Sequence, residues 1–151
     1  MLIREAGLAD IIGVDEICDA SGRSRWSPNL LRVKQDRQVL VAEVEGKVIG
    51  VAKTHFHEDS GGDGPAGHYL GGIVVAREYR RQGVATALTK KRLDWIWSVA
   101  GTAYYFANEH NIASIRMHEG FGFRELGRFA NIHGVTADDG QSYLILFEAH
   151  R

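Results

Sequence analysis

The stretch that most constrains this chain is residues 75–88, V-A-R-E-Y-R-R-Q-G-V-A-T-A-L, together with the segments on either side of it. A β-rich run over 69–75 comes first, and apolar residues at helical spacing follow over 84–99. We therefore expect a strand to end near 75 and a helix to begin near Gln82. A helix start leaves backbone N–H groups without partners and carries the positive end of the helix dipole. The junction is thus a candidate site for a phosphate or pyrophosphate.

The residue types at this junction also favour an anionic ligand. Gly83 has no side chain, so a ligand can approach the backbone closely, and Ala85 keeps the first turn small. Arg77, Arg80 and Arg81 add positive charge at the same end. The alternative is an ordinary glycine near a helix start with solvated arginines. The stretch is neither a Walker loop nor a dinucleotide fingerprint, because both G-K-S/T and G-x-G-x-x-G are absent.

Composition limits the class of protein. The 151 residues fit one domain, which we expect to span 1–151. The formal net charge of -1 gives no basic field for nucleic acid, and no apolar run is long enough for a membrane span. A single cysteine, Cys18, excludes an intrachain disulfide, and the N-terminus has no signal-peptide core. We expect a soluble, cytoplasmic protein that binds neither nucleic acid nor membrane.

Charge is distributed unevenly along the chain. Residues 77–92 contain six basic residues and one acid, whereas 57–66 contain three acids and no Lys or Arg. Asp138 and Asp139 form a second acidic segment. A basic side and an acidic side would suit a polyanionic cofactor and a cationic acceptor. The alternative is solvated surface charge.

Hydrophobic periodicity and turn signals predict an α+β chain with a mixed sheet of six to seven strands and about four helices. Strands are expected over 2–5, 38–45, 48–56, 68–75, 101–108, 121–130 and 142–148, and helices over 8–18, 28–35, 82–99 and 111–119. Ser27 and Pro28 suit the N-cap and first position of the second helix. Residues 45–47, Glu-Gly-Lys, predict a tight hairpin.

Two segments match motifs of a known family. Residues 80–85 fit Q/R-x-x-G-x-G/A, and 108–123 contain N-x-x-(A/S)-I-x-x-(Y/H)-E-x-x-G-F. With their separation and the element order, they resemble the GNAT superfamily of acetyl-CoA-dependent N-acetyltransferases over essentially the whole chain. Relatives usually carry Tyr at the position of His118. A histidine at this position resembles the phosphinothricin-acetyltransferase-like branch of the superfamily. The resemblance implies a GNAT fold and an acetyltransferase that moves acetyl from acetyl-CoA to a primary amine by direct attack.

The resemblance leaves the acceptor open. A small amine, an amino acid, an aminoglycoside-like compound and a protein N-terminus are all compatible with it, and a small-molecule amine is the expected partner. A homodimer is expected by analogy. The alternative function is a non-catalytic acyl-CoA-binding regulatory module. In the superfamily the region after the first helix borders the acceptor pocket, so Arg23, Arg25 and Trp26 are either substrate contacts or loop residues.

The resemblance also implies which residues hold the cofactor. The pyrophosphate is expected on the backbone amides of residues 81–86, and the pantetheine arm is expected on Asn111. The full expected set is Ile73, Val74, Val75, Arg80, Arg81, Gln82, Gly83, Val84, Ala85, Thr86, Asn108, Asn111 and Ser114.

His118 is the first catalytic candidate. Residues 111, 114/115 and 118 are expected on one helix face, which would present Asn111 and His118 to the same ligand. Relatives keep a proton donor for the departing thiolate seven positions after this Asn, and an imidazole could serve in that role. The alternative is a structural histidine that bonds a neighbouring carbonyl.

The general base is less defined. Relatives often place Glu or His at the positions of Tyr69 and Gly71, and neither residue is a base at neutral pH. His68 is adjacent, but strand alternation should point it to the other face. Residues 55–59 or a water chain could serve instead. Tyr69 and His68 remain catalytic candidates beside His118.

No metal is expected. His55 and His57 alternate on one strand near Asp59 and Asp63, but no third ligand has suitable spacing for zinc. Cys18 could be a nucleophile, yet it lies in a helix with core periodicity, so core packing is the stronger interpretation.

Overall fold

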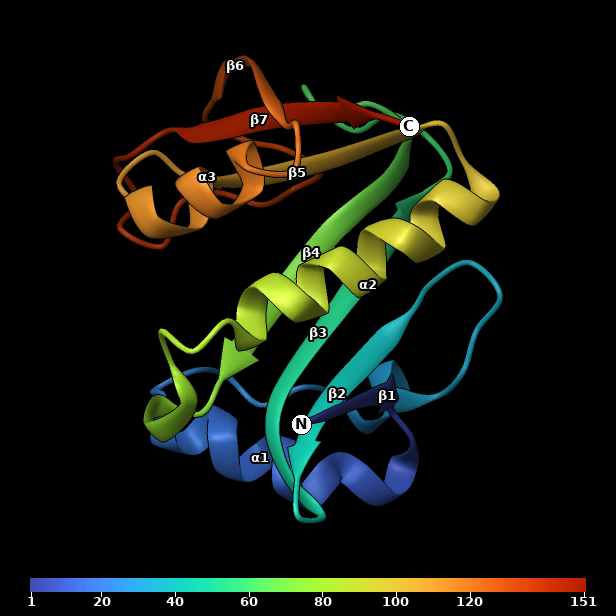
Figure 1. The fold of residues 1–151 in the computed structure, drawn as a ribbon. Helices are drawn as coiled ribbons and strands as arrows, with labels where there is room; N and C mark the ends of the chain where they lie inside the picture. The colour runs from blue at the N-terminus through green and yellow to red at the C-terminus, as the bar shows by residue number, and fades with distance from the viewer. The chain divides into compact units, whose positions relative to one another are not determined.

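The computed structural model describes all of residues 1–151 and shows an α+β chain (Figure 1). The strands are β1 (Leu2–Glu5), β2 (Val39–Val44), β3 (Lys47–His57), β4 (Gly67–Val75), β5 (Thr102–Asn108), β6 (Arg124–Phe129) and β7 (Leu144–His150). The helices are α1 (Ile11–Ala20), α2 (Val84–Val99) and α3 (Ile112–Glu119), with short 3-10 turns η1 (Leu8–Asp10), η2 (Pro28–Leu31) and η3 (Arg77–Tyr79). None of the helices is both long and apolar enough to cross a bilayer.

The sheet has seven strands in the order β1-β2-β3-β4-β5-β7-β6. Strand β4 runs parallel to β5, whereas β1 with β2, β2 with β3, and β7 with both β5 and β6 are antiparallel. The predicted mixed sheet is therefore confirmed. The chain divides into two compact units, an N-terminal unit (residues 1–55 and 71–92) and a C-terminal unit (residues 56–70 and 93–151).

The N-terminal unit has its own apolar core, built from both faces of β2 and β3, from α1, and from the first turns of α2. Cys18 is fully buried in this core, and burial raises the pKa of its thiol, so the core interpretation of this residue is confirmed. The hairpin between β2 and β3 turns at Glu45 (φ 52°) and Gly46 (φ 79°). Positive φ at both central residues matches the tight hairpin turn predicted from the sequence.

The second predicted helix is wrong. The cap was correctly located, because Ser27 Oγ accepts a hydrogen bond from the Asn29 amide at 3.3 Å and Pro28 follows. The helix ends at Leu31, however, and Arg32 is already extended (φ -77°, ψ 137°). Residues 32–36 are exposed and offer no apolar face to pack. Capping without such a face does not sustain a helix, so three α-helices form in place of about four.

The C-terminal unit holds two apolar clusters. In the first, α3 packs against β5 and β7 through residues that include Ile115, Tyr105 and Phe147 (Figure 1). In the second, Tyr69 packs with residues of β7 and of the β6–β7 loop, including Ile132. These clusters position the residues of the second sequence motif and of the central strand.

Candidate functional site

A hollow of ≈ 270 Å³ opens in the N-terminal unit where β4 passes into α2. Residues of the predicted strand-to-helix junction line the hollow, together with Tyr79 of η3. The lining residues are Val75, Tyr79, Arg80, Arg81, Gly83, Val84, Ala85 and Thr86. Seven of these eight residues belong to the set expected to hold the cofactor, and Tyr79 does not. The residues that the sequence groups at this turn are therefore brought together around one open space.

The turn that borders the hollow contains two left-handed residues. Arg81 has φ 61° and Gly83 has φ 83°, and α2 begins at Val84, two residues later than predicted. A Cβ on Gly83 would meet no atom within 4 Å, so the space in front of this backbone is open. Such turns collect backbone N–H groups into an anion-binding concavity, and the start of the 16-residue α2 adds its dipole.

Two predicted side chains are used to build the turn. The Arg80 guanidinium donates through Nε to the Val75 carbonyl at 3.0 Å and through a terminal nitrogen to Ser21 Oγ at 3.0 Å. Gln82 Nε2 donates to the Glu78 carbonyl at 2.9 Å. These bonds fix η3 between β4 and α2, so Arg80 and Gln82 shape the turn, and of the two only Arg80 lines the hollow.

The lining of the hollow is chemically suited to an anion that carries an organic arm. Arg80, Arg81 and the Gly83 turn are its polar part, and Val75, Val84 and Ala85 are its apolar part. Of the other β4 residues expected to hold the cofactor, Val74 is 6 % exposed and packs in the core, so only its backbone can face a ligand. Ile73 is partly buried against the same core.

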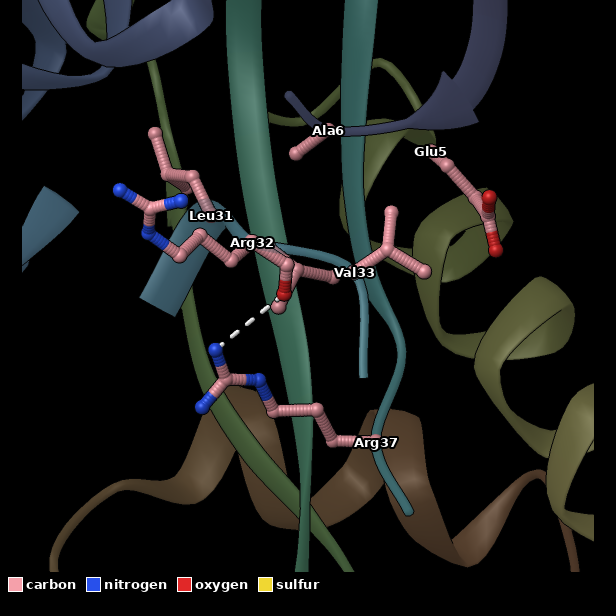
Figure 2. A pocket seen from close by; sticks show the side chains of 7 residues that line it. Glu5, Ala6, Leu31, Arg32, Val33 and Arg37 are labelled. Carbon is pink, nitrogen blue, oxygen red and sulfur yellow. Dashed lines mark hydrogen bonds between the residues drawn. The ribbon is translucent and has the colours of Figure 1, made fainter. Parts of the chain in front are cut away.

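A second hollow in the same unit is too small for such a ligand (Figure 2). It measures ≈ 10 Å³ and is lined by Glu5, Ala6, Leu31, Arg32, Val33, Arg37 and Val39. A volume of about 10–15 Å³ holds a single water molecule. The larger hollow at the β4–α2 junction is therefore the candidate ligand site of this unit.

The second motif lies in the C-terminal unit, and its histidine faces inward. His118 is 2 % exposed and its ring stacks on that of Tyr105, with centroids 3.5 Å apart. Its Nδ1 lies 2.8 Å from the Ser114 carbonyl oxygen, so Nδ1 carries the proton and donates it to that carbonyl. Phe123 packs edge-on against the same ring. This arrangement supports the structural alternative for His118.

Asn111 stands at the start of α3. It is the N-cap, with φ -82° and ψ 66°, and its carbonyl accepts a hydrogen bond from the Ile115 amide at 3.1 Å. Its side chain is exposed and makes no capping hydrogen bond, whereas Ile115 and His118 are buried. Asn111 can therefore meet a ligand, and the face that it was expected to share with His118 stays a prediction.

The two remaining polar residues of this motif have partners in the C-terminal unit. Asn108 Oδ1 accepts from the His110 amide at 2.9 Å. The Ser114 hydroxyl is hydrogen-bonded to the Tyr105 hydroxyl. Asn108 thus also stabilises the turn between β5 and α3, and Ser114 also joins α3 to β5.

Tyr69 and His68 point to opposite sides of β4, as strand alternation predicts. Tyr69 is 1 % exposed, and its hydroxyl donates to the Pro65 carbonyl at 2.7 Å. Burial raises the pKa of Tyr69 above its ordinary value, and the nearby Tyr104 adds to the rise. His68 instead packs against Phe56 and Trp95. At neutral pH the Tyr69 hydroxyl keeps its proton and is not a base.

A pair of stacked imidazoles next to Tyr69 was not predicted. The rings of His57 and His133 are 3.6 Å apart and nearly parallel, at 6°. His133 Nε2 lies 2.8 Å from the Pro65 carbonyl, and its amide donates to the Gly61 carbonyl at 3.1 Å. The β3–β4 loop and the β6–β7 loop are joined by these bonds. No sequence signal connects residues so far apart in the chain.

The two acidic segments differ in whether their carboxylates are hydrogen-bonded within the protein. Asp139 accepts hydrogen bonds from Ser142 and Gln141 within its own turn, and these hold the pKa of Asp139 well below its usual range, the Ser142 hydroxyl having the largest effect. The carboxylates of Glu58, Asp59 and Asp63 lie on exposed residues. No group of three or more His, Cys, Asp or Glu side chains is arranged to hold a metal ion.

A model of the acetyltransferase (GNAT) family matches residues 12–123, well over half of the chain. This chain is a member of the GNAT acetyltransferase family. The matched range contains both sequence motifs and the hollow at the β4–α2 junction, so the resemblance drawn from the motifs is confirmed. Among curated proteins no sequence matches this one.

Solved structures show the same fold as this GNAT protein. The ribosomal-protein-S18-alanine N-acetyltransferase from Escherichia coli is 21% identical with a TM-score of 0.77, covering 99% of this chain and 92% of that one. YncA from Salmonella typhimurium, a putative acetyltransferase solved with its cofactor acetyl-CoA, is 20% identical with a TM-score of 0.76 and the same coverage. A ribosomal-protein-alanine N-acetyltransferase from Brucella melitensis is 22% identical, with a TM-score of 0.75 and complete coverage of both chains.

Sequence analysis missed Tyr79 as a residue of this GNAT hollow. It lies in η3, a turn of only three residues between β4 and α2. Such a turn is too short to show a periodic pattern. The one available signal was that Tyr79 lies between Arg77 and Arg80 in the sequence. This neighbourhood does not by itself distinguish a residue that lines a pocket from a surface residue.

Proposed function

We propose that this chain moves the acetyl group of acetyl-CoA to a primary amine, which attacks directly within a ternary complex. The observation that carries the proposal is the open hollow at the β4–α2 junction, with its left-handed turn at Arg81 and Gly83. Membership of the GNAT family and the complex of YncA with acetyl-CoA support the same ligand.

The N-terminal unit would hold the cofactor mainly through its backbone. The amides of residues 81–86 and the start of α2 would bind the pyrophosphate, with Arg81 adding charge. Val75, Tyr79 and Val84 would line the adjoining arm. In the C-terminal unit, the exposed Asn111 side chain is the group we assign to the pantetheine arm.

Bound acetyl-CoA would supply an activated acyl group and a thiolate as leaving group. The protein's own task is then to hold the amine near the thioester and to manage two protons. His118 remains the residue that the family motif nominates for protonating the thiolate, although its Nδ1–H is already donated to Ser114. Neither Tyr69 nor Gly71 can accept the proton of the incoming ammonium, so we assign that step to water or to residues 55–59.

The proposed acceptor class is a small-molecule amine. Two of the structural neighbours are named for acetylating a ribosomal-protein alanine, so a protein N-terminus is the second class to test. The experiment is thiol release from acetyl-CoA with a panel of amines, amino acids, aminoglycosides and N-terminal peptides, combined with calorimetric titration of CoA.

The two measurements separate the possible functions. Turnover with at least one amine, together with CoA binding, is the result we expect. CoA binding without turnover on any amine would instead identify a non-catalytic acyl-CoA-binding module. Absence of CoA binding by the folded protein would reject both functions.

A further inference from the structure

Lys53, in strand β3 of the N-terminal unit, carries a partly buried positive charge. Its ammonium nitrogen lies 4.7 Å from the centroid of the Trp26 ring. Burial lowers the pKa of Lys53, and the nearby charge of Arg37 lowers it further. Arg4 pairs with Asp10 and Glu43 and Arg25 with Asp15 and Asp19, whereas Lys53 and Arg37 form no salt bridge with these acids.

Arg37 is a second cation whose donors are only partly used (Figure 2). One terminal nitrogen donates to the carbonyl oxygens of Asn29 and Arg32, the latter at 3.3 Å. Its Nε is buried and has no hydrogen-bond partner. A buried donor without an acceptor is unfavourable, and so is a second positive charge close to a desolvated one. An anion bound to Lys53 and Arg37 would accept a hydrogen bond from the unpaired donor and would offset the repulsion between the two positive charges.

Two glycines of β4 make room for this charge immediately before residues 73–75. A Cβ on Gly71 would lie 2.7 Å from His55 Cδ2 and 3.1 Å from Lys53 Cγ, so Gly71 makes room for both side chains. A Cβ on Gly72 would lie 3.5 Å from Lys53 Cε and 3.6 Å from Trp26 Cζ2. Lys53 and Trp26 therefore lie directly against the strand. Because the proposed function places the cofactor along residues 73–75, the Lys53 ammonium lies beside the segment that an acceptor must approach.

We propose that Lys53, held by Trp26 and accompanied by Arg37, binds an anionic group of the acceptor, so that the preferred acceptors are small amines that also carry a carboxylate, as amino acids do. The proposal rests on the proposed function and names its substrate class. A carboxylate would form charge-assisted hydrogen bonds with the ammonium, which are stronger than neutral ones. The Trp26 ring already holds that ammonium by a cation–π contact, which reduces the cost of ordering it on binding.

The test compares the kcat/KM of each L-amino acid with that of its own carboxamide. Thiol release from acetyl-CoA gives the rates. The carboxamide keeps the amine and side chain but has no negative charge. In the wild-type protein, kcat/KM for the best acid should exceed that of its amide by about tenfold or more, because a hydrogen bond to a charged group contributes about a decade in affinity.

Lys53→Met should bring this ratio close to one by lowering the rate with the acid alone. Lys53→Arg should keep part of the preference, since it keeps the charge. Lys47→Met is the matched control, because Lys47 lies on the same strand but is exposed, and it should leave the ratio unchanged. The calorimetric Kd for CoA should be the same in all four proteins, and melting temperatures establish that each is folded.

Amides that react as well as acids in the wild-type protein would overturn the proposal, and so would an unchanged ratio in Lys53→Met. Equal loss with acids and amides would place Lys53 in the chemistry and also contradict acceptor recognition. If uncharged or purely cationic amines alone are acetylated, this proposal fails while the proposed function stands. If CoA binds but no amine is acetylated, the proposed function fails first.

Discussion

The β4–α2 junction and helix α3 both carry a family motif, but the structure uses the two in opposite ways. At the junction, in the N-terminal unit, the motif surrounds an open hollow of ≈ 270 Å³. Along α3, in the C-terminal unit, the motif's histidine is 2 % exposed and stacks on Tyr105. The first motif lines a space that a ligand can enter, whereas Ile115, His118 and Phe123 of the second are packed inside its own unit.

The difference follows from which atoms each motif employs. At the junction the groups that we propose to bind the ligand are backbone N–H donors, and Gly83 suits the turn because its φ is 83°. Any sequence that makes this turn exposes those donors. In α3 the candidate group is a side chain, and the direction of a side chain depends on packing against Tyr105 and Phe123. A motif that works through the backbone therefore reports its function more directly than one that works through a side chain.

Gly83→Glu should have the largest effect. The new side chain would place bulk and negative charge where the pyrophosphate is expected, and the positive φ would strain it. CoA affinity should fall by at least about a hundredfold, which corresponds to about 2.7 kcal/mol. Isothermal titration calorimetry measures this change.

Gly46→Glu is the matched control for that variant. Gly46 has φ 79°, also lies in the N-terminal unit, and has no atom within 4 Å of the position its Cβ would take. Both variants should lose similar stability from left-handed strain, about 1–2 kcal/mol. Equal CoA affinity in the two folded variants would remove the hollow from cofactor binding.

His118→Phe tests the other side of the comparison. Phenylalanine can keep the stack on Tyr105 but leaves the buried Ser114 carbonyl without the Nδ1–H donor. We expect the free energy of unfolding to fall by about 1–3 kcal/mol, and kcat to change by less than about tenfold. Denaturant unfolding and steady-state kinetics give the two quantities.

A different outcome would revive the catalytic role of His118. If kcat falls by about tenfold or more while stability and the Kd for CoA stay the same, the histidine assists thiolate departure. His118→Tyr should then recover part of the rate, because tyrosine is the usual residue at this position of the motif.

Arg81→Gln should have a smaller effect than Gly83→Glu if the backbone does most of the binding. The loss of one exposed charge should weaken CoA binding by about three- to tenfold at low salt, and less at high salt because of screening. Lys47→Gln, an exposed lysine of the same unit, is the control. If Arg81→Gln lowers CoA affinity as much as Gly83→Glu does, the charge of the side chain and not the backbone would dominate CoA binding.

The smallest effect concerns the stacked pair His57 and His133. Burial lowers the pKa of His57, and the charge of His133 lowers it further. Because the unfolded chain then binds more protons than the folded one below about pH 6.5, stability should fall as pH drops through that value. His57→Phe should flatten this dependence. Melting temperatures between pH 7.5 and 5.5 test it, and an unchanged slope in the variant would exclude His57 as the source.

Much of the fold was predictable because its signals are local. The Glu45-Gly46 turn, the Cys18 face of α1 and the strand-to-helix junction at Gly83 each follow from a few neighbouring residues. The helix expected over 28–35 failed because a good cap at Ser27 does not compensate for the missing apolar face.

The candidate site was predictable where it depends on the backbone and less so where it depends on tertiary packing. The burial of His118, for example, results from its packing against Tyr105 and Phe123. The bonding of His133 to Pro65 joins residues 68 positions apart and left no local pattern. The contact of Lys53 with Trp26 is likewise a consequence of how β3 packs, so the acceptor subsite proposed here emerged only from the structure.

The most direct test of the central claim is a ¹H–¹⁵N NMR titration of the wild-type protein with CoA, compared with pantetheine, which lacks the pyrophosphate. CoA should shift the backbone amide signals of residues 81–86, and pantetheine should leave those signals in place. Saturation with CoA that leaves the amides of 81–86 unchanged would contradict the assignment of this turn as the pyrophosphate site.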